Sequence, residues 1–402
     1  MIIAIIGGGA SGMAAALAAS ENRNAKIILL EKQARVGKKL QATGNGRCNL
    51  TNLHALEYGY HGDSPEFCRY ALEHFDPQET LKWFESLGLF TVSEPSGRVY
   101  PYSDQANSVL DILRFALMKE NIELKTDWEV IRAKKRNGGF ILENGKEQIQ
   151  CDKLIIACGG LAGTKLGGSL SGYKLLQSFG HTCSKLRPSL VQIKADWKGI
   201  KALKGIRANC RAAIFCNNQK FASSEGEIQF TEYGLSGPVI FEISRDACSR
   251  AGKWVAEIDL LPQTDENALI QELNRRKSTA LTTDDLLTGI LHNRLGRVLT
   301  KMAEIPFGIA VQQVEEQKIK KLCKLVKSFQ IPLKEPLGMD HAQVTAGGIH
   351  TKDFLESTME SRLVKGLYAC GEVLDIDGDC GGFNLQWAWC SGRLAGHSAA
   401  EL

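Results

Sequence analysis

Three glycines near the N-terminus have the spacing of a phosphate-binding turn. Gly7, Gly9 and Gly12 lie between an apolar run, Ile2 to Ile6, and an alanine-rich helical stretch, Met13 to Ala19. In such a turn the first glycine permits the bend, the second lets the backbone approach a pyrophosphate, and the third lets helix and strand pack closely. The helix N-terminus supplies amide donors and a partial positive charge. The spacing therefore predicts a dinucleotide site.

An acidic residue completes this pattern. The next apolar run, Lys26 to Leu30, ends at Glu31, nineteen residues beyond Gly12. A carboxylate at this point can accept hydrogen bonds from both hydroxyls of a ribose, whereas it repels a 2′-phosphate. FAD or NAD therefore suits this first site better than NADP.

A second segment with anion-binding character follows. The stretch from Val36 to Asn52 is rich in glycine, asparagine and hydroxyl side chains, and it carries three cations: Lys38, Lys39 and Arg47. A solvated surface loop is the plain alternative, but it does not account for cations beside so many amide donors. We interpret the stretch as an anion-binding loop close to the first site.

The C-terminal sixty residues return to the glycine-rich style. A short apolar strand starting at Leu367 ends in Gly371-Glu372, and Gly381-Gly382 open a helix that continues through 387–400. The acid can accept from a ribityl hydroxyl, and the helix start can face a pyrophosphate or the flavin pyrimidine carbonyl. The alternative is an ordinary pair of glycine-capped helices. A long dinucleotide such as FAD needs both features at its far end.

The elements that position these loops change character along the chain. Residues 1–189 and 342–402 are predicted to form one α/β domain, in which a buried strand, Leu154 to Ala157, is closed by Cys158-Gly159-Gly160. Between them, 190–260 and 330–341 predict an antiparallel sheet or small barrel. The strands expected there are Leu190 to Ile193, Asn209 to Phe215, Lys220 to Ala222, Gly226 to Thr231 and Trp254 to Leu260.

A helical insert is expected within the barrel segment, over 261–329. Three amphipathic stretches predict its helices: Thr264 to Lys277, Thr283 to Leu295 and Val314 to Phe329.

Composition narrows the functional classes. The 402 residues carry a net charge of only +4 and contain no apolar run long enough to span a membrane. The twelve cysteines form no Cys-x-x-Cys pair, so a zinc site, a disulfide framework and disulfide reductase chemistry are not expected. A cytoplasmic protein with no metal site is the simplest interpretation. Neither a Ser-His-Asp set nor any other catalytic residue can be assigned.

These segments together resemble the BaiN-like or YhiN-like bacterial FAD-dependent oxidoreductases. The matching motifs cover essentially the whole chain: Gly7 to Gly12, Thr43 to Asn52, Phe230 to Pro238, Thr345 to Ile349 and Gly366 to Gly396. The resemblance implies a glutathione-reductase-like FAD-binding Rossmann domain with an inserted β-barrel domain and a small helical domain.

The resemblance also implies a set of FAD contacts. Around the adenosine and pyrophosphate they are Gly7, Gly9, Ala10, Ser11, Gly12, Glu31 and Lys32, with a backbone contact from Val130 to adenine and a further contact at Gly159. On the flavin side they are Thr43, Gly44, Arg47, Cys48 and Asn49. The ribityl chain and ring would be held by Gly371, Glu372, Gly381, Gly382, Phe383 and Asn384. The loop from Leu161 to Ser169 departs from the family pattern.

The activities that the resemblance implies share a flavin as hydride carrier. The favoured one is NAD(P)H-dependent reduction of a conjugated C=C bond in an enone-type small molecule such as a steroid-like compound. The alternatives are dihydrouridine synthesis in ribosomal RNA, oxidation of a small amino ketone, and non-catalytic FAD binding. RNA would require a basic surface, for which the stretch Lys185 to Arg211 offers eight cations against one acid, Asp196.

Overall fold

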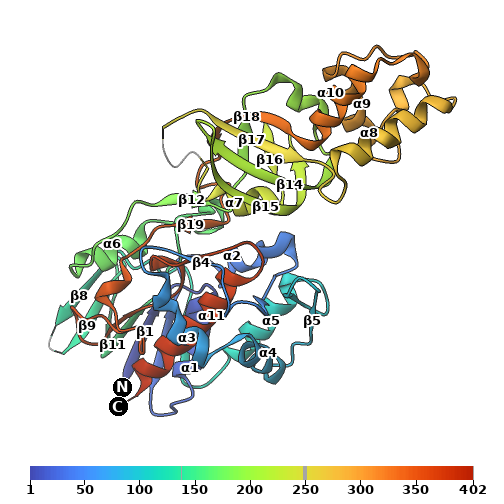
Figure 1. Cartoon of the computed structure of the whole chain (residues 1–402). Coiled ribbons are helices and arrows are strands. Elements are labelled where there is room, and N and C mark those ends of the chain that lie inside the picture. The colour runs from blue at the N-terminus through green and yellow to red at the C-terminus, as the bar shows by residue number, and fades with distance from the viewer. Residues whose placement is uncertain (137, 248–250, 402) are drawn as a thin grey trace. The chain divides into compact units, whose positions relative to one another are not determined.

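The computed structural model describes residues 1–136, 138–247 and 251–401 (Figure 1). It divides into two compact units. Met1–Pro188 and Ala342–Leu402 form the first, which we call the Rossmann unit. Ser189–His341 form the second, which we call the barrel unit.

A parallel sheet forms the centre of the Rossmann unit. Its strand order is β20-β11-β1-β2-β7, and every neighbouring pair is parallel. The apolar runs account for this arrangement, because strands covered on both faces must be apolar along their whole length. The bounds are β1 Ile2–Ile6, β2 Lys26–Leu30, β7 Ile122–Lys125, β11 Lys153–Ile156 and β20 Leu367–Ala369.

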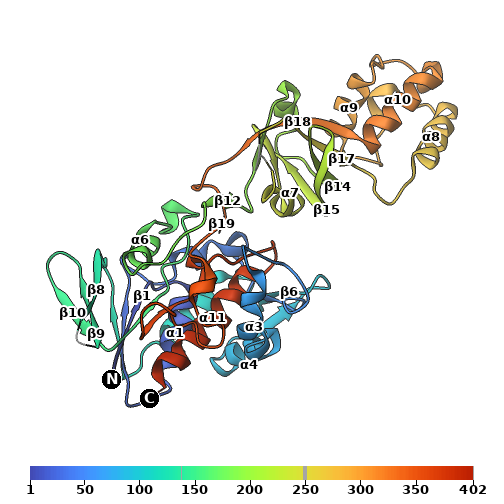
Figure 2. The ribbon, with the colours of Figure 1, turned by 60° about the vertical axis from the view of Figure 1, so that its left-hand side comes forward.

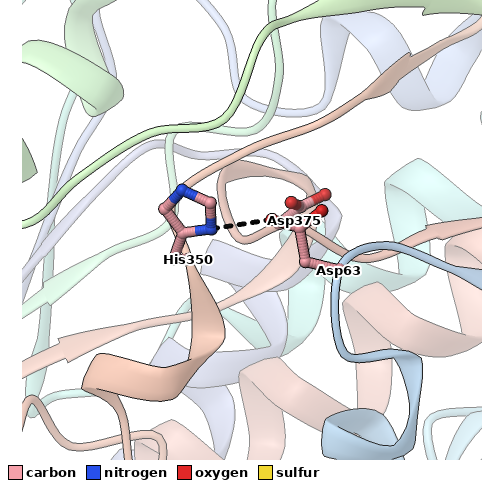
Figure 3. Close-up of side chains that lie close together, drawn as sticks. All are labelled: Asp63, His350 and Asp375. Carbon is pink, nitrogen blue, oxygen red and sulfur yellow. Dashed lines mark ion pairs between the residues drawn. The ribbon is translucent and has the colours of Figure 1, made fainter.

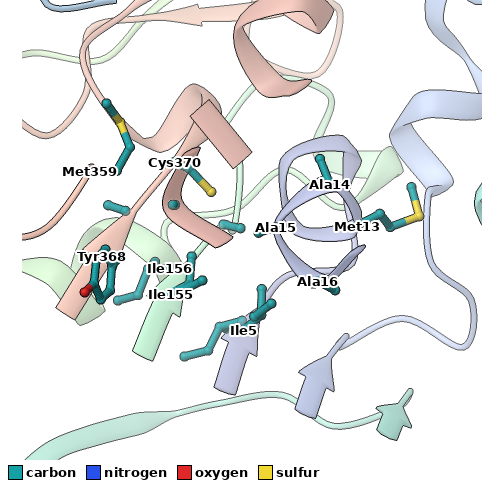
Figure 4. Packing of buried hydrophobic residues seen from close by; sticks show 14 of the residues in the cluster. Ile5, Met13, Ala14, Ala15, Ala16, Ile155, Ile156, Met359, Tyr368 and Cys370 are labelled. Carbon is teal, nitrogen blue, oxygen red and sulfur yellow. The ribbon is translucent and has the colours of Figure 1, made fainter. Parts of the chain in front are cut away.

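Two helices from opposite ends of the chain pack beside this sheet. Helix α1 (Ala10–Ala19) lies along α11 (Phe383–Ala400). Small residues permit this approach, since a Cβ added to Gly392 would lie 2.3 Å from the Ser11 carbonyl oxygen. Figure 4 shows α1 facing Ile5 and the isoleucines of β11. The packing brings the N-terminal and C-terminal loops to one site.

Smaller elements surround this core. A meander of β8 (Arg132–Arg136), β9 (Gly139–Glu143) and β10 (Gln148–Cys151) forms a separate sheet. Another sheet pairs β6 with both β3 and β5; these strands are Arg98–Pro101, Thr51–Asn52 and Thr91–Ser93. The remaining helices of eight or more residues are α4 Pro77–Ser86, α5 Ala106–Ala116 and α6 Ser171–Ser178 within the described residues.

The barrel unit contains a closed barrel in the order β13-β16-β15-β14-β17-β18. Its strands are β13 Ile193–Ala195, β14 Arg207–Cys216, β15 Gln219–Phe230, β16 Gly234–Ser236, β17 Trp254–Asp259 and β18 Phe329–Pro336. Helix α7 (Pro238–Ser244), which the sequence did not predict, packs against β15. The barrel therefore follows the period-two pattern of this region.

Two strand predictions need correction. The predicted strands Lys220 to Ala222 and Gly226 to Thr231 belong to the single strand β15, which ends at Phe230, because β14 pairs with both segments without a break between them. The strand expected from Leu190 begins only at Ile193, because Leu190 adopts a left-handed backbone with φ of +49°.

The helices of the barrel unit are α8 (Glu266–Arg275), α9 (Asn293–Met302) and α10 (Glu316–Lys327) (Figure 2). The helix expected over Thr283 to Leu295 is wrong. Only a short 3-10 turn forms at its start, because the Thr283 hydroxyl donates to the Pro306 carbonyl and Gly289 has a φ of +80°.

The Rossmann unit, the closed barrel and these helices confirm the predicted α/β fold class. Among the described residues, no helix combines the length and apolarity that crossing a membrane requires.

Candidate functional site

The glycine turn after β1 has the geometry that a phosphate requires. Gly7 has a φ of +107°, and a Cβ added there would lie 2.4 Å from the Ala157 carbonyl oxygen. A Cβ at Gly12 would lie 1.8 Å from the Gly7 carbonyl oxygen. At Gly9, by contrast, a Cβ would have no described atom within 4 Å. The outer glycines therefore serve internal packing, while Gly9 borders open space.

The N-terminus of α1 begins beside this open space. The N-cap residue is Gly9, which has no side chain to cap the helix, and the first turn contains no acid. The first amides of a helix lack intrahelical partners, so these donors suit an anion. A Cβ at Gly159 would likewise meet no described atom within 4 Å. This combination fits a pyrophosphate group.

Glu31 is held in place by backbone donors. Its Oε2 accepts from the Gly8 amide at 2.7 Å, and its Oε1 accepts from the Gln33 amide at 2.7 Å. Each carboxylate oxygen has a further lone pair for a ribose hydroxyl. The sequence indicated the acid but not these two bonds, which fix its orientation next to the glycine turn.

The loop that begins at Thr43 folds tightly. Its backbone is left-handed at Gly44, Asn45 and Cys48, with φ values of +56°, +57° and +61°. The Cys48 amide donates to the Thr43 carbonyl at 3.0 Å, and the Asn49 side chain accepts from the backbone of β6. Non-glycine residues rarely adopt this conformation, and such strain concentrates at functional sites.

The Arg47 side chain is already engaged within the Rossmann unit. It forms ion pairs with Asp104 and Glu94 and lies over the ring of Tyr100, 3.9 Å from its centroid. Its guanidinium therefore orders the Thr43 loop.

Cys48 has the properties of a structural thiol. Its side chain is fully buried, and desolvation raises its pKa to about 12. Because the thiolate is the reactive form, we expect Cys48 to resist iodoacetamide at about pH 8 in the folded protein. Peptide-level mass spectrometry checks this, with urea-unfolded protein as the positive control. Alkylation at the rate of a free thiol in the folded protein would contradict the prediction.

Glu372 joins the two ends of the chain. Its Oε2 pairs with Lys39 Nζ at 2.8 Å, and its Oε1 accepts from the Thr345 amide at 2.8 Å. A Cβ at Gly371, the residue before it, would lie 2.5 Å from Ser11 Oγ. The C-terminal acid and the first glycine turn therefore lie at one site.

The same network reaches the loop that departs from the family pattern. The Ala162 amide donates to Thr345 Oγ1 at 2.9 Å, and a Cβ at Gly160 would lie 2.3 Å from Glu372 Oε1. Thr345 belongs to a motif found in the sequence, but its role there could not be assigned. The structure places this divergent loop beside Glu372.

A second glycine turn precedes α11. Gly381 and Gly382 have φ values of +125° and +106°. The Asn384 side chain both accepts from and donates to the backbone of Gly378. Phe383 packs against Tyr60, with ring centroids 5.9 Å apart. The N-cap residue of α11 is Gly382, which, like the glycine before α1, has no side chain to cap the helix. The first amides of α11 are therefore available to an acceptor.

Val130 lies at a cleft of about 950 Å³ between β8 and α6. Exposed Ile131 and Leu170 are among the apolar residues that line it, together with the hydroxyl residues Ser169 and Ser171. Lys32 follows Glu31 in the chain and is half-buried.

The parallel sheet, the open glycine turn with its uncapped helix, and the second helix start from the far end of the chain define a Rossmann-type FAD-binding domain. The amino-acid sequence then identifies the family within this class. The chain belongs to the HI0933-like family, because the model of the HI0933-like protein Rossmann domain matches residues 1–398. The chain is accordingly an FAD-dependent oxidoreductase, and the predicted resemblance is confirmed.

Two relatives match along almost their whole lengths. The chain is 39% identical to a 3-dehydro-bile acid delta(4,6)-reductase of Clostridium scindens, with 99% of each chain covered. It is 31% identical to a ribosomal RNA dihydrouridine synthase of Escherichia coli, over 96% of this chain and 95% of that one. A flavocytochrome c3 fumarate reductase structure is similar at 14% identity and a TM-score of 0.48, covering 99% of this chain and 78% of that chain.

Proposed function

We propose that this protein reduces a conjugated C=C bond in a steroid-like enone, using NAD(P)H as the electron donor. The observation that carries the proposal is the match over 99% of both chains to a reductase of 3-dehydro-bile acids. The relative named as an RNA-modifying enzyme is more distant, at 31% identity.

We further propose that FAD occupies the site built around the two glycine turns. The first amides of α1 would bind the pyrophosphate beside Gly9, and Glu31 would bind the ribose. Val130 would contact adenine through its backbone. Glu372 would accept from a ribityl hydroxyl, and the start of α11 would face the flavin ring. The open space at Gly9 supports the first of these contacts.

Bound FAD supplies the capacity to accept a hydride from NAD(P)H and to deliver it to the β-carbon of the enone. The chain binds and orients the reactants. The Thr43 loop and the amides of α11 would hold the ring of the cofactor, and Thr345 connects Glu372 to the divergent loop from Leu161 to Ser169. This loop is accordingly a determinant of substrate preference.

Anaerobic reduction of the purified holoenzyme tests the proposal. We expect NADPH or NADH to bleach the flavin and a 3-keto steroid enone to reoxidise it stoichiometrically. The released cofactor should be FAD, because a shorter FMN would not reach both glycine turns. Reduction of the flavin by aminoacetone, followed by its reoxidation by O2 to hydrogen peroxide, would favour the amino ketone oxidase. A flavin that neither nicotinamide reduces would favour a non-catalytic protein.

Ribosomal RNA remains the second candidate substrate, since one relative carries that name. The basic stretch Lys185 to Arg211 was its main support, but four of its cations form ion pairs with glutamates in the barrel unit. These pairs are Lys194–Glu335, Lys204–Glu232, Arg207–Glu227 and Arg211–Glu225. The paired acids reduce the positive potential that would attract phosphates, so we favour the enone.

RNA binding should consequently be weak and nearly independent of these cations. Counterion release gives a log–log salt slope of roughly one per phosphate contact, about 0.7 on single strands. We expect no such slope for ribosomal RNA fragments in fluorescence anisotropy, and no change in the Lys201→Glu/Lys204→Glu/Arg207→Glu variant. A slope of about 3 or more that this variant abolishes would make RNA the leading candidate.

A further inference from the structure

Three side chains with metal-ligating groups meet in the Rossmann unit, outside the two glycine turns. Asp63 follows β4 (Tyr60–His61), His350 follows β19 (Val344–Ala346), and Asp375 precedes β21 (Asp377–Gly378). Figure 3 shows the imidazole of His350 turned toward the side chains of Asp63 and Asp375, which overlap in this view. One ligand atom from each residue lies within 4.8 Å of the others.

The distances suit a first-row metal ion. His350 Nδ1 lies 2.9 Å from Asp63 Oδ2. With metal–ligand bonds of about 2.1 Å, neighbouring ligand atoms in octahedral geometry are about 3.0 Å apart and opposite ones about 4.2 Å apart. The 2.9 Å separation matches neighbouring octahedral ligand atoms, and the 4.8 Å limit on the other separations exceeds the value for opposite ligand atoms by about 0.6 Å.

A second observation is that the buried carboxylate of this cluster has little positive charge around it. Asp375 is only 2% exposed, and the neighbouring group that stabilises its charged form most is the neutral hydroxyl of Ser184. Among the described residues, no lysine or arginine forms an ion pair with it. The carboxylates of Asp63 and Asp377 also face it, whereas His350 is the facing basic group. Buried carboxylates are normally paired or bound to metal, and this one is short of positive charge.

We propose that Asp63, His350 and Asp375 bind one divalent transition-metal cation. The imidazole selects against Mg²⁺ and Ca²⁺, which prefer oxygen ligands, while the two carboxylates suit Mn²⁺ or Fe²⁺. The ion would join three chain segments just before the second glycine turn. The sequence alone predicted no metal site, because these residues lie far apart along the chain.

Manganese binding to the full-length, flavin-containing protein tests this proposal. After treatment with a chelator, the protein is titrated with Mn²⁺ while free Mn²⁺ is followed by electron paramagnetic resonance. We expect one ion per chain with a Kd well below about 1 mM, and no displacement by equimolar Mg²⁺. Loss of an outer-sphere partner alone costs roughly 10- to 100-fold in metal affinity, so Asp63→Asn and His350→Gln should each lose at least as much.

His397→Gln is the matched control, because His397 also faces a carboxylate, that of Glu21 at 3.7 Å, but has no third ligand among the described residues. This variant should bind Mn²⁺ as the wild type does. Asp63→Asn is the main variant, since its side chain is 64% exposed and its replacement should not disturb folding. The absence of binding to wild type, or an equal loss in His397→Gln, would overturn the proposal. Flavin absorbance and thermal melting identify variants that have failed to fold.

Discussion

Replacing Gly9 with valine should remove flavin from the protein while leaving its fold intact. Position 9 has a φ of −79°, which valine can adopt, and an added Cβ meets no described atom within 4 Å. If the pyrophosphate occupies that space, the branched side chain excludes it. We expect FAD to bind at least 100-fold more weakly, a loss of about 2.8 kcal/mol.

Two other glycines make this experiment specific. Gly338→Val in the barrel unit also adds a side chain where no described atom lies within 4 Å of the Cβ, so it should keep both fold and flavin. Gly12→Ala should lose both, because its Cβ would lie 1.8 Å from a backbone oxygen, a clash that costs about 3 kcal/mol or more. Flavin absorbance per chain and circular dichroism melts report the outcomes. Full flavin content in folded Gly9→Val would show that the pyrophosphate lies elsewhere.

The sequence predicted the central sheet well because buried parallel strands are apolar along their whole length. Strands β1 and β2 have the predicted bounds, and β20 begins at the predicted Leu367 but ends at Ala369, before the predicted Gly371-Glu372. The glycine turn could be predicted equally well, because all three glycines lie within one strand–turn–helix unit whose spacing is visible in the sequence. The pattern within a single segment was therefore enough to predict the part of the site that this segment forms.

Pattern failed where contacts between distant segments decide the structure. The stretch from Thr283 to Leu295 has helical spacing, yet the hydroxyl of the buried Thr283 donates to the Pro306 carbonyl instead. The two predicted strand pieces on either side of Glu225 form one strand because a partner strand spans both. The periodicity of a segment contains no information about a hydrogen bond to a distant segment or about the length of a partner strand.

The site shows the same division. Glu31 could be found from its distance to Gly12, but the amides that orient it could not. The ion pair between Lys39 and Glu372 joins residues 333 positions apart, and only the folded chain brings them together. Thr345 likewise stood in a motif without a visible partner until the fold placed it beside Glu372.

Glu372→Gln should have the second large effect. The carboxylate uses one oxygen for Lys39 Nζ and the other for the Thr345 amide. Glutamine keeps the shape but supplies only one acceptor, so its NH2 group must face either Lys39 or the backbone donor. We expect FAD affinity to fall about 10- to 100-fold and stability to fall by about 1–3 kcal/mol. Equilibrium dialysis of FAD and urea unfolding measure the two effects.

A second substitution separates direct from indirect action of Glu372. In the Lys39→Met/Glu372→Gln double variant the unpaired ammonium is gone, so much of the stability should return. If Glu372 accepts a hydrogen bond from the ribityl chain, the FAD affinity should stay low in the double variant. Recovery of affinity together with stability would instead mean that Glu372 acts only by holding Lys39. Glu335→Gln removes a similar ion pair, to Lys194 at 2.7 Å in the barrel unit, and should change FAD affinity in neither direction.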